Sequence, residues 1–289
     1  MSSERNGASP DGLPPLREVI RDLGLTAKKS LGQNFILDLN LTRRIARAAG
    51  PLEGKAVIEV GPGPGGLTRA LLLEGAACVI AVERDERCRP ALEAIALRHP
   101  GRLAIHIADG LDTDWRALLG SNSSVLIVAN LPYNIATRLL VGWLETEPWP
   151  PWWQGMTLMF QKEVAERVTA EPATKAYGRL AVISQWRTRP HIALTLGPEA
   201  FTPPPAVASA IVEFVPKPVL EPPCSVTTLG RVTAAAFGQR RKMLRQSLKG
   251  LVPEPLKLLA SVGLDPELRA ERLTVGDFAR LAYAVDAAT

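Results

Sequence analysis

The chain is poor in the residue types that build disulfide frameworks and metal centres. It has three cysteines and three histidines among 289 residues. An odd number of scattered cysteines forms neither a disulfide framework nor paired metal-ligand motifs, so we expect reduced thiols and no metal site. These residues are Cys78, Cys88 and Cys224, and His99, His106 and His191.

Long apolar runs are also missing. A membrane-spanning helix needs about 18 or more apolar residues in succession. The nearest run, residues 67–82, is interrupted by Arg69 and Glu74. The first fifteen residues are polar and lack the apolar core of a signal peptide. We therefore expect a soluble, cytoplasmic protein in which residues 1–15 are disordered.

Acidic residues are absent from one basic stretch near the C-terminus. The whole chain carries a net charge of +5, which permits an anionic partner without establishing one. No acid occurs in residues 231–250, and clustered Lys and Arg side chains favour contact with RNA phosphates over a merely solvated helix face. The basic residues are Arg231, Arg240, Arg241, Lys242, Arg245 and Lys249.

The length and composition predict one large domain and one small domain. The hydrophobic fraction of 46% and the charged fraction of 22% are typical of a globular protein. Prolines in residues 216–223 indicate a linker. We therefore expect a large domain over residues 16–216 and a small helical domain over residues 217–289, the region that holds the basic stretch.

A glycine-rich loop follows the first predicted strand, residues 56–60. Gly61, Gly63 and Gly66 precede a helical pattern that begins at Leu67. A strand, a glycine turn and a helix form the nucleotide-binding arrangement, and the glycine spacing also fits a dinucleotide site. Glu59 and the prolines of the loop argue against a pyrophosphate, because an acid repels a phosphate but attracts a cationic ligand such as a sulfonium.

Three more buried strands are predicted to end in polar side chains. An acid about 20 residues beyond a glycine turn can accept hydrogen bonds from ribose hydroxyls, as expected for Glu83. Asp109 is placed either to accept from an adenine amine or to cap a turn. With intervening helices, the pattern predicts a doubly wound parallel sheet. The strands are residues 78–82, 103–107 and 125–129, followed by Glu83, Asp109 and Asn130.

The tetrapeptide Asn130-Leu131-Pro132-Tyr133 follows the fourth of these strands. Ligands of open α/β sheets bind at the carboxyl ends of the strands. Asn130 offers an acceptor and a donor, Pro132 stiffens the loop, and Tyr133 offers a flat face for stacking. Together these groups suit a planar ring that carries an amino group, although an ordinary strand-to-loop turn has the same local pattern.

Other segments supply further candidates. Gln33 and Asn34 lie in a basic stretch, residues 28–38, that either covers a ligand or links two helices. Phe201 precedes three prolines, so a stiff loop presents an aromatic ring. The pattern also predicts strands at residues 156–160 and 180–186, and helices at residues 16–23, 39–49 and 163–169.

In its motifs the chain resembles the ribosomal RNA adenine dimethyltransferases. The resemblance runs from about residue 16 to the C-terminus, and among the members of this family it is nearest to the bacterial small-subunit enzymes. One position departs from it, since Ala206 stands where the family often has a lysine. The motifs are residues 31–35 (LGQNF), 59–68 (EVGPGPGGLT), 130–133 (NLPY), 160–167 (FQKEVAER), 177–180 (YGRL), 201–205 (FTPPP) and 237–242 (FGQRRK).

The resemblance implies a Rossmann-like methyltransferase that uses S-adenosyl-L-methionine. It implies that the enzyme dimethylates two adjacent adenines near the 3′ end of 16S rRNA, within the small ribosomal subunit, and is monomeric away from it. The implied base-site residues are Asn130, Leu131, Pro132, Tyr133 and Phe201. The implied cofactor residues are Gln33, Asn34, Ile36, Glu59, Gly61, Gly63, Glu83, Asp109 and Asn130, and the RNA-binding residues are Arg240, Arg241, Lys242 and Arg245.

Three alternatives stay open at this point. One is a related methyltransferase of the macrolide-resistance type, which acts on 23S rRNA. The second is a nicotinamide-dependent oxidoreductase that uses the glycine loop. The third is a non-catalytic ribosome assembly factor that kept the fold.

Overall fold

The computed structural model describes residues 9–27, 32–119 and 125–288. Contacts divide the chain into two compact units, each made of three segments. The first unit holds Met1–Leu140, Trp152–Lys162 and Ile192–Glu213, and the second holds Val141–Pro151, Glu163–His191 and Phe214–Thr289. The predicted domain boundary between residues 216 and 217 stays a prediction.

A sheet of strands in the order β3-β2-β1-β4-β5-β7-β6 runs through the fold. The strands β1 to β5 pair in parallel, which confirms the predicted parallel sheet for β1 to β4 and adds β5, whose residues were predicted only as a strand. Every residue of β1 and β4 is buried, as expected for central parallel strands covered on both faces. The strands are β1 (Ala56–Val60), β2 (Cys78–Glu83), β3 (Leu103–Ile107), β4 (Val125–Ala129), β5 (Gly155–Gln161), β6 (Thr188–Leu196) and β7 (Ser209–Pro216).

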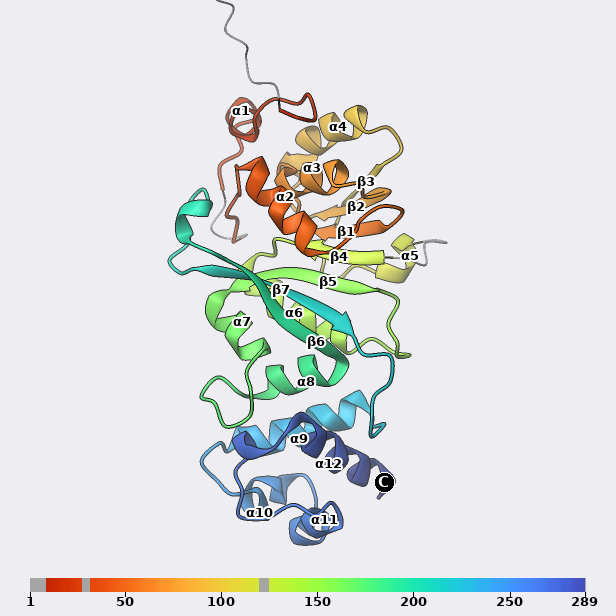
Figure 1. The fold of residues 1–289 in the computed structure, drawn as a ribbon, viewed down its shortest axis with the longest axis vertical. Coiled ribbons are helices and arrows are strands. Elements are labelled where there is room, and N and C mark those ends of the chain that lie inside the picture. Colours follow the sequence, from red (N-terminus) through yellow and green to blue (C-terminus); the bar gives the residue numbers. More distant parts are fainter. Residues whose placement is uncertain (1–8, 28–31, 120–124, 289) are drawn as a thin grey trace, which may run out of the picture. The chain divides into compact units, whose positions relative to one another are not determined.

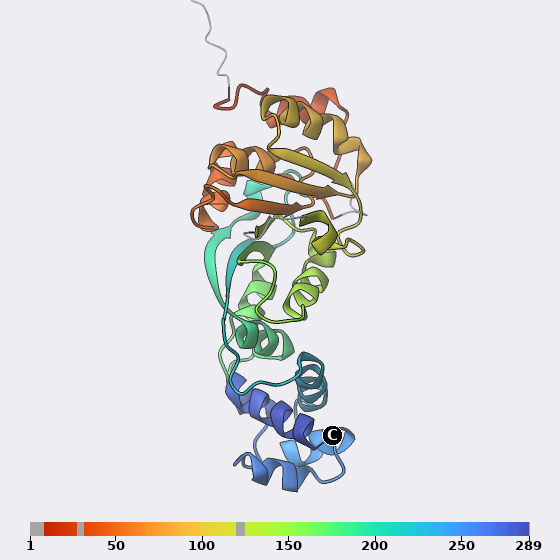
Figure 2. The ribbon, with the colours of Figure 1, turned by 90° about the vertical axis from the view of Figure 1, so that its right-hand side faces the viewer.

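Helices cover the sheet in the first unit. Helix α2 packs on α3, α3 contacts β2, and α4 contacts β3 (Figure 1). The strands from the first half of the chain lie side by side in the turned view (Figure 2). The helices are α1 (Leu16–Asp22), α2 (Leu39–Ala48), α3 (Gly66–Leu73), η2 (Glu86–Cys88), α4 (Arg89–Arg98), α5 (Trp115–Leu119), α6 (Tyr133–Leu144) and η3 (Pro198–Ala200).

The second unit is mainly helical and has its own apolar core. Helix α12 packs against α8 and α9. The ring of Phe237 stacks on Phe278 at 5.3 Å between centroids and meets the edge of Tyr177 at 6.0 Å. The helices are α7 (Lys162–Val168), α8 (Arg179–Arg187), α9 (Val226–Gly238), α10 (Leu244–Ser247), η4 (Leu248–Gly250), α11 (Pro255–Ser261), η5 (Ala270–Arg272) and α12 (Val275–Ala287).

One predicted strand is wrong. Residues 180–186 form part of helix α8, not a strand. Its buried side chains include Ala181, Val182 and Trp186, and they belong to the core that α8 shares with α9 and α12. A short apolar run reads equally well as a strand or a helix, and packing on neighbouring helices decides between them.

Two kinds of feature are absent from the described residues. No described helix has the length and apolar character needed to cross a membrane. Among the same residues, no cluster of three or more His, Cys, Asp or Glu side chains could hold a metal ion. Cys78, Cys88 and Cys224 are free thiols.

Candidate active site

The glycine loop joins β1 to the first turn of α3. The backbone N–H of Gly61 donates to the carbonyl of Val82 at 2.9 Å, which ties the start of the loop to β2. Gly65 precedes α3 with a φ of 90°. A Cβ there would lie 2.2 Å from Cδ1 of Ile95, so both the backbone conformation and the space demand glycine.

Glu83, at the end of β2, is bonded to this loop. Its carboxylate accepts a hydrogen bond of 2.8 Å from the backbone N–H of Gly63 and one of 2.7 Å from that of Asp85. Burial raises the pKa of Glu83 against the opposing effect of these donors. Each carboxylate oxygen has a further lone pair, so the side chain can still accept from ligand hydroxyls.

Glu59 is a buried acid beside the same loop. It is 1% exposed, and its carboxylate accepts a hydrogen bond of 2.6 Å from the hydroxyl of Thr68. Burial, with a smaller contribution from the charge of Glu83, raises the pKa of Glu59 to about 8. A cation bound nearby would favour the ionised form of this carboxyl.

Asp109 and Asn130 continue the row along the carboxyl ends of the strands. Asp109 accepts a hydrogen bond of 3.0 Å from the backbone N–H of Leu111 and pairs with Arg84 at 3.1 Å. The turn role and the ligand role considered for Asp109 are therefore compatible, since one carboxylate can accept several hydrogen bonds. Asn130 follows the last residue of β4 and lines the same cavity as Asp109.

An N-terminal segment, residues 32–36, lies against these groups. The amide of Gln33 donates to Asp85 at 3.0 Å, and the ion pair with Arg87 lowers the pKa of Asp85 to about 2. The backbones of Phe35 and Thr202 exchange hydrogen bonds of 2.9 and 2.8 Å. The segment predicted to cover a ligand began at residue 28, and residues 28–31 lie outside the described residues.

The loop after β4 leads directly into α6. The carbonyl of Pro132 accepts from the backbone N–H groups of Ile135 and Ala136, both at 3.1 Å. Among the described residues, none donates to the carbonyl of Leu131. The hydroxyl of Tyr133 is 2.6 Å from that of Ser209.

One cavity in the first unit collects nearly all the predicted site residues. Its ionisable lining consists of three acids, Glu59, Glu83 and Asp109, and one base, Arg84. Such a lining suits a cationic ligand better than a pyrophosphate. The predicted residues that line it are Gln33, Asn34, Ile36, Glu59, Gly61, Gly63, Glu83, Asp109, Asn130, Leu131, Pro132 and Tyr133.

Phe201 is the predicted base-site residue that this cavity leaves out. Its side chain is 3% exposed and belongs to the apolar core of the first unit. It is not among the described residues that line the cavity. The ring is therefore packed as a core side chain in this arrangement, and not presented for stacking as the proline-rich loop predicted.

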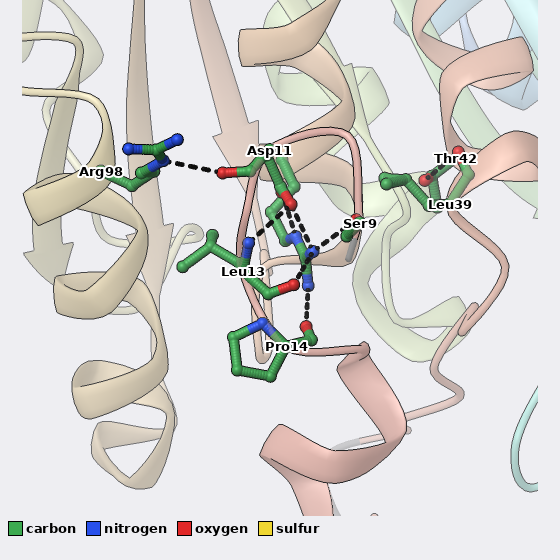
Figure 3. Close-up of polar contacts among 8 residues, drawn as sticks. Ser9, Asp11, Leu13, Pro14, Leu39, Thr42 and Arg98 are labelled. Atoms are coloured by element: carbon green, nitrogen blue, oxygen red, sulfur yellow. Dashed lines mark hydrogen bonds and ion pairs between the residues drawn. The ribbon is translucent and has the colours of Figure 1, made fainter. Parts of the chain in front are cut away.

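The sequence did not reveal a buried ion pair that anchors the chain just before α1. The guanidinium of Arg69, on α3, bonds to both carboxylate oxygens of Asp11 at 2.5 and 2.7 Å. It also donates to Ser9 and to the carbonyl of Pro14, and Figure 3 shows these groups converging. Leu16, which lines the cavity, follows directly. The two partners are 58 residues apart, so no local pattern links them. The disorder predicted for residues 1–15 is therefore wrong at residues 9–15, and residues 1–8 lie outside the described residues.

The predicted RNA-binding residues of the second unit differ in their contacts. Arg240 pairs with Glu271 at 3.0 Å and donates to the carbonyl of Lys175 at 2.9 Å. Arg245 lies 3.6 Å from Glu267. The side chains of Arg241 and Lys242 are exposed. Arg240 thus has a structural role in this unit, and exposure makes the other two accessible to an anionic partner.

The chain matches a single family of known proteins over most of its length. Residues 24–286 match the family model described as ribosomal RNA adenine dimethylase. The chain is 60% identical to Ribosomal RNA small subunit methyltransferase A of Xanthobacter autotrophicus, over 94% of each chain. It is 59% identical to the protein of the same name from Cereibacter sphaeroides, over 96% of this chain and 99% of that one.

A solved structure shows the same fold. The dimethyladenosine transferase from Plasmodium falciparum superposes with a TM-score of 0.73 and 23% identity, covering 86% of this chain and 96% of that one. The family match extends over both units of the chain. On these findings, the chain belongs to the ribosomal RNA adenine dimethylase family.

Proposed function

We propose that this enzyme transfers methyl groups from S-adenosyl-L-methionine to two adjacent adenines near the 3′ end of 16S rRNA, within the small ribosomal subunit. The product is N6,N6-dimethyladenosine, formed during small-subunit biogenesis. One observation carries the proposal: the acid-rich ends of β1 and β2 and the loop Asn130–Tyr133 meet at a single cavity. The names of the relatives at about 60% identity support the choice of substrate.

The acids of the cavity fit the proposed cofactor. The sulfonium of S-adenosyl-L-methionine supplies an electrophilic methyl group and a positive charge. Acidic side chains of the lining favour this charge, and the bound sulfonium would in turn favour the ionised form of Glu59, whose pKa burial raises to about 8. Glu83 would accept from the ribose hydroxyls, and Asp109 from the adenine amine of the cofactor.

Asn130 and Leu131 are the groups proposed to hold the target amine. The Asn130 side-chain N–H group points to the carbonyl of Asn34 at 3.5 Å, which leaves its carbonyl oxygen to accept. The Pro132 carbonyl already accepts two hydrogen bonds in the first turn of α6, so the Leu131 carbonyl is the better second acceptor. Two acceptors on one amine draw its lone pair out of conjugation and aim it at the methyl carbon.

Beyond these hydrogen bonds, methyl transfer depends on how the target adenine is positioned against the cofactor. A target adenine must leave its RNA stack to reach the cavity, and Tyr133 supplies a face on which it can stack. Phe201 would have to turn out of the core to give a second face. The attacking nitrogen becomes acidic as it is alkylated and can lose its proton to water, so the proposal needs no dedicated base. Holding both reactants in line is the main contribution of the enzyme.

In the second unit, Arg241, Lys242 and Arg245 are proposed to contact RNA phosphates. The side chains of all three are exposed. Phosphate contacts of this kind position an RNA without reading its sequence. Choice of the two adenines would then rest on the shape of the RNA around them.

The proposal is tested with purified protein and labelled S-adenosyl-L-methionine. Undermethylated small subunits, naked 16S rRNA and 23S rRNA are offered in parallel, and the labelled nucleosides are identified after digestion. Dimethyladenosine formed only in the small-subunit particle is the expected result. Label in 23S rRNA would place the protein with the macrolide-resistance type, and cofactor binding without any label would support an assembly factor.

A further inference from the structure

Tyr133 and Ser209 come from distant parts of the chain and meet at the proposed base site. Their hydroxyl oxygens are 2.6 Å apart, although the residues are separated by 76 positions. Ser209 is the first residue of β7 and is completely buried. The carbonyl of its neighbour, Ala208, accepts from the backbone N–H of Lys162 at 2.9 Å. The Ser209 hydroxyl is therefore a fixed point in the first unit.

The Tyr133 ring is held at both of its ends. At one end, its backbone begins α6, whose first turn is closed on the Pro132 carbonyl. At the other end, the phenolic hydroxyl is bonded to Ser209. A ring that is fixed at Cα and at its hydroxyl oxygen cannot swing about the Cα–Cβ bond without breaking that hydrogen bond. The hydrogen bond thus fixes the long axis of the ring beside the site that Tyr133 lines with Asn130.

The hydroxyl of Ser209 is a polar group in a buried, apolar part of β7. The three residues that follow it in the strand, Ala210, Ile211 and Val212, are buried and apolar. Burying a hydroxyl costs free energy unless it is hydrogen-bonded. Among the hydrogen bonds of the described residues, the Ser209 hydroxyl has one partner, and that partner is Tyr133.

From this geometry we infer that Ser209 is a positioning residue for methyl transfer, because its hydroxyl holds the Tyr133 ring in place beside the site before the target base arrives. The inference rests on the proposed function, since it assigns Tyr133 to the target adenine. Ser209 does not itself touch the base. Its removal should slow transfer without weakening cofactor binding, because the acids that hold the cofactor come from other strands.

The first test reads the Tyr133 hydroxyl directly and needs no activity. The chain has three tyrosines, so protein labelled with ¹³C at tyrosine Cζ gives three signals, and Tyr133→Phe identifies one of them. In a mixture of H₂O and D₂O, the exchange rate of each hydroxyl proton is read from its Cζ signal. Exchange at Tyr133 should be about tenfold or more faster in Ser209→Ala than in the wild type. Equal rates would overturn the inference.

The second test measures transfer to undermethylated small subunits. Ser209→Ala should lower kcat about tenfold and leave the KM for S-adenosyl-L-methionine within about twofold. Tyr133→Phe removes the same hydrogen bond from the other side and keeps the ring. The double variant should be no slower than the slower single variant, because both changes break one bond.

Controls separate positioning from damage to the fold. Ser184→Ala removes another fully buried serine hydroxyl, on α8, and should leave kcat unchanged. If Ser209→Ala does not fold, Ser209→Cys replaces it in both tests, because a thiol has nearly the same shape but is a much weaker hydrogen-bonding group. A kcat within twofold of wild type, or effects of the two single variants that multiply, would contradict the inference. If the wild type methylates no adenine, the proposed function fails, and the exchange test still decides whether Ser209 fixes Tyr133.

Discussion

The carboxylate of Glu83, at the end of β2, accepts a hydrogen bond of 2.8 Å from the backbone N–H of Gly63, in the loop after β1. The acid proposed to bind the cofactor is therefore also a support of the glycine loop. A substitution of Glu83 should therefore remove a proposed contact with the cofactor and also loosen the glycine loop.

Replacing Glu83 with glutamine should weaken S-adenosyl-L-methionine binding about 10- to 100-fold, because charge-assisted hydrogen bonds are among the stronger ones. Calorimetry of the cofactor with the purified variant measures this. Glu86→Gln is the matched control, since Glu86 is three residues away and 78% exposed at its side chain. Equal cofactor affinity in Glu83→Gln and the wild type would remove Glu83 from the cofactor site.

The pH dependence of stability should reveal Glu59. Its folded-state pKa of about 8 is above the ordinary value of 4.5, so the folded protein binds more protons than the unfolded chain between these values. Stability contributed at this position is thus lost as pH rises from about 4.5 to 8. Glu59→Gln removes this titration. The free energy of unfolding of the variant, relative to that of the wild type, should therefore rise by about 4 kcal/mol between pH 4.5 and pH 8.

Melting of the cofactor-free protein across this pH range checks the effect of Glu59→Gln. The exposed acid Glu93, on α4, provides the control variant Glu93→Gln. A constant difference between wild type and Glu59→Gln at all pH values would show that Glu59 titrates as an ordinary carboxyl.

Breaking the anchor between Asp11 and Arg69 should destabilise the first unit. Both side chains are buried, at 0% and 4% exposure, and loss of one partner of a buried ion pair costs about 3–5 kcal/mol. Asp11→Asn should therefore lower the free energy of unfolding by this amount in denaturant titrations. Asp22→Asn breaks an exposed pair with Arg21 and should cost less than about 1 kcal/mol.

A double variant shows whether the unpaired charge of Arg69 causes the loss of stability in Asp11→Asn. Asp11→Asn combined with Arg69→Met leaves no unpaired buried guanidinium, so it should recover part of the loss. A single Asp11→Asn variant as stable as the wild type would mean that residues 9–15 are not anchored by this pair.

The basic residues near the C-terminus should separate into two groups. Arg240→Gln should lower the melting temperature, because it removes the contacts with Glu271 and the carbonyl of Lys175. Arg241→Gln and Lys242→Gln should not change melting. Each of these two variants should weaken binding to small subunits and reduce the slope of log affinity against log salt by about 1. An unchanged salt slope would argue against phosphate contacts at these positions.

Four of the parallel strands and the row of ligand groups could be predicted because their signals are local. Each strand is a short apolar run that ends in a polar residue, and parallel strands bring those ends to one edge. Glu83 and Asn130 were found in this way, and both line the cavity. Helix α8 was mistaken for a strand because its apolar run is short, and only its neighbours decide its state.

The contacts that support the site could not be predicted from local patterns. Asp11 meets Arg69 across 58 positions, and Tyr133 meets Ser209 across 76. Such pairs depend on how the chain folds back on itself. The burial of Phe201 also depends on distant parts of the chain. The prolines after it predict a stiff loop, but they do not determine whether its side chain faces the core or the cavity.

The most direct test of the account is the single-turnover rate of Asn130→Ala on undermethylated small subunits, at saturating S-adenosyl-L-methionine. The proposed role in holding the target amine predicts a loss of about 100-fold or more, with unchanged melting. Asn40→Ala, at an exposed position on α2, should react at the wild-type rate. Near-normal turnover by folded Asn130→Ala would contradict the placement of the chemistry at this loop.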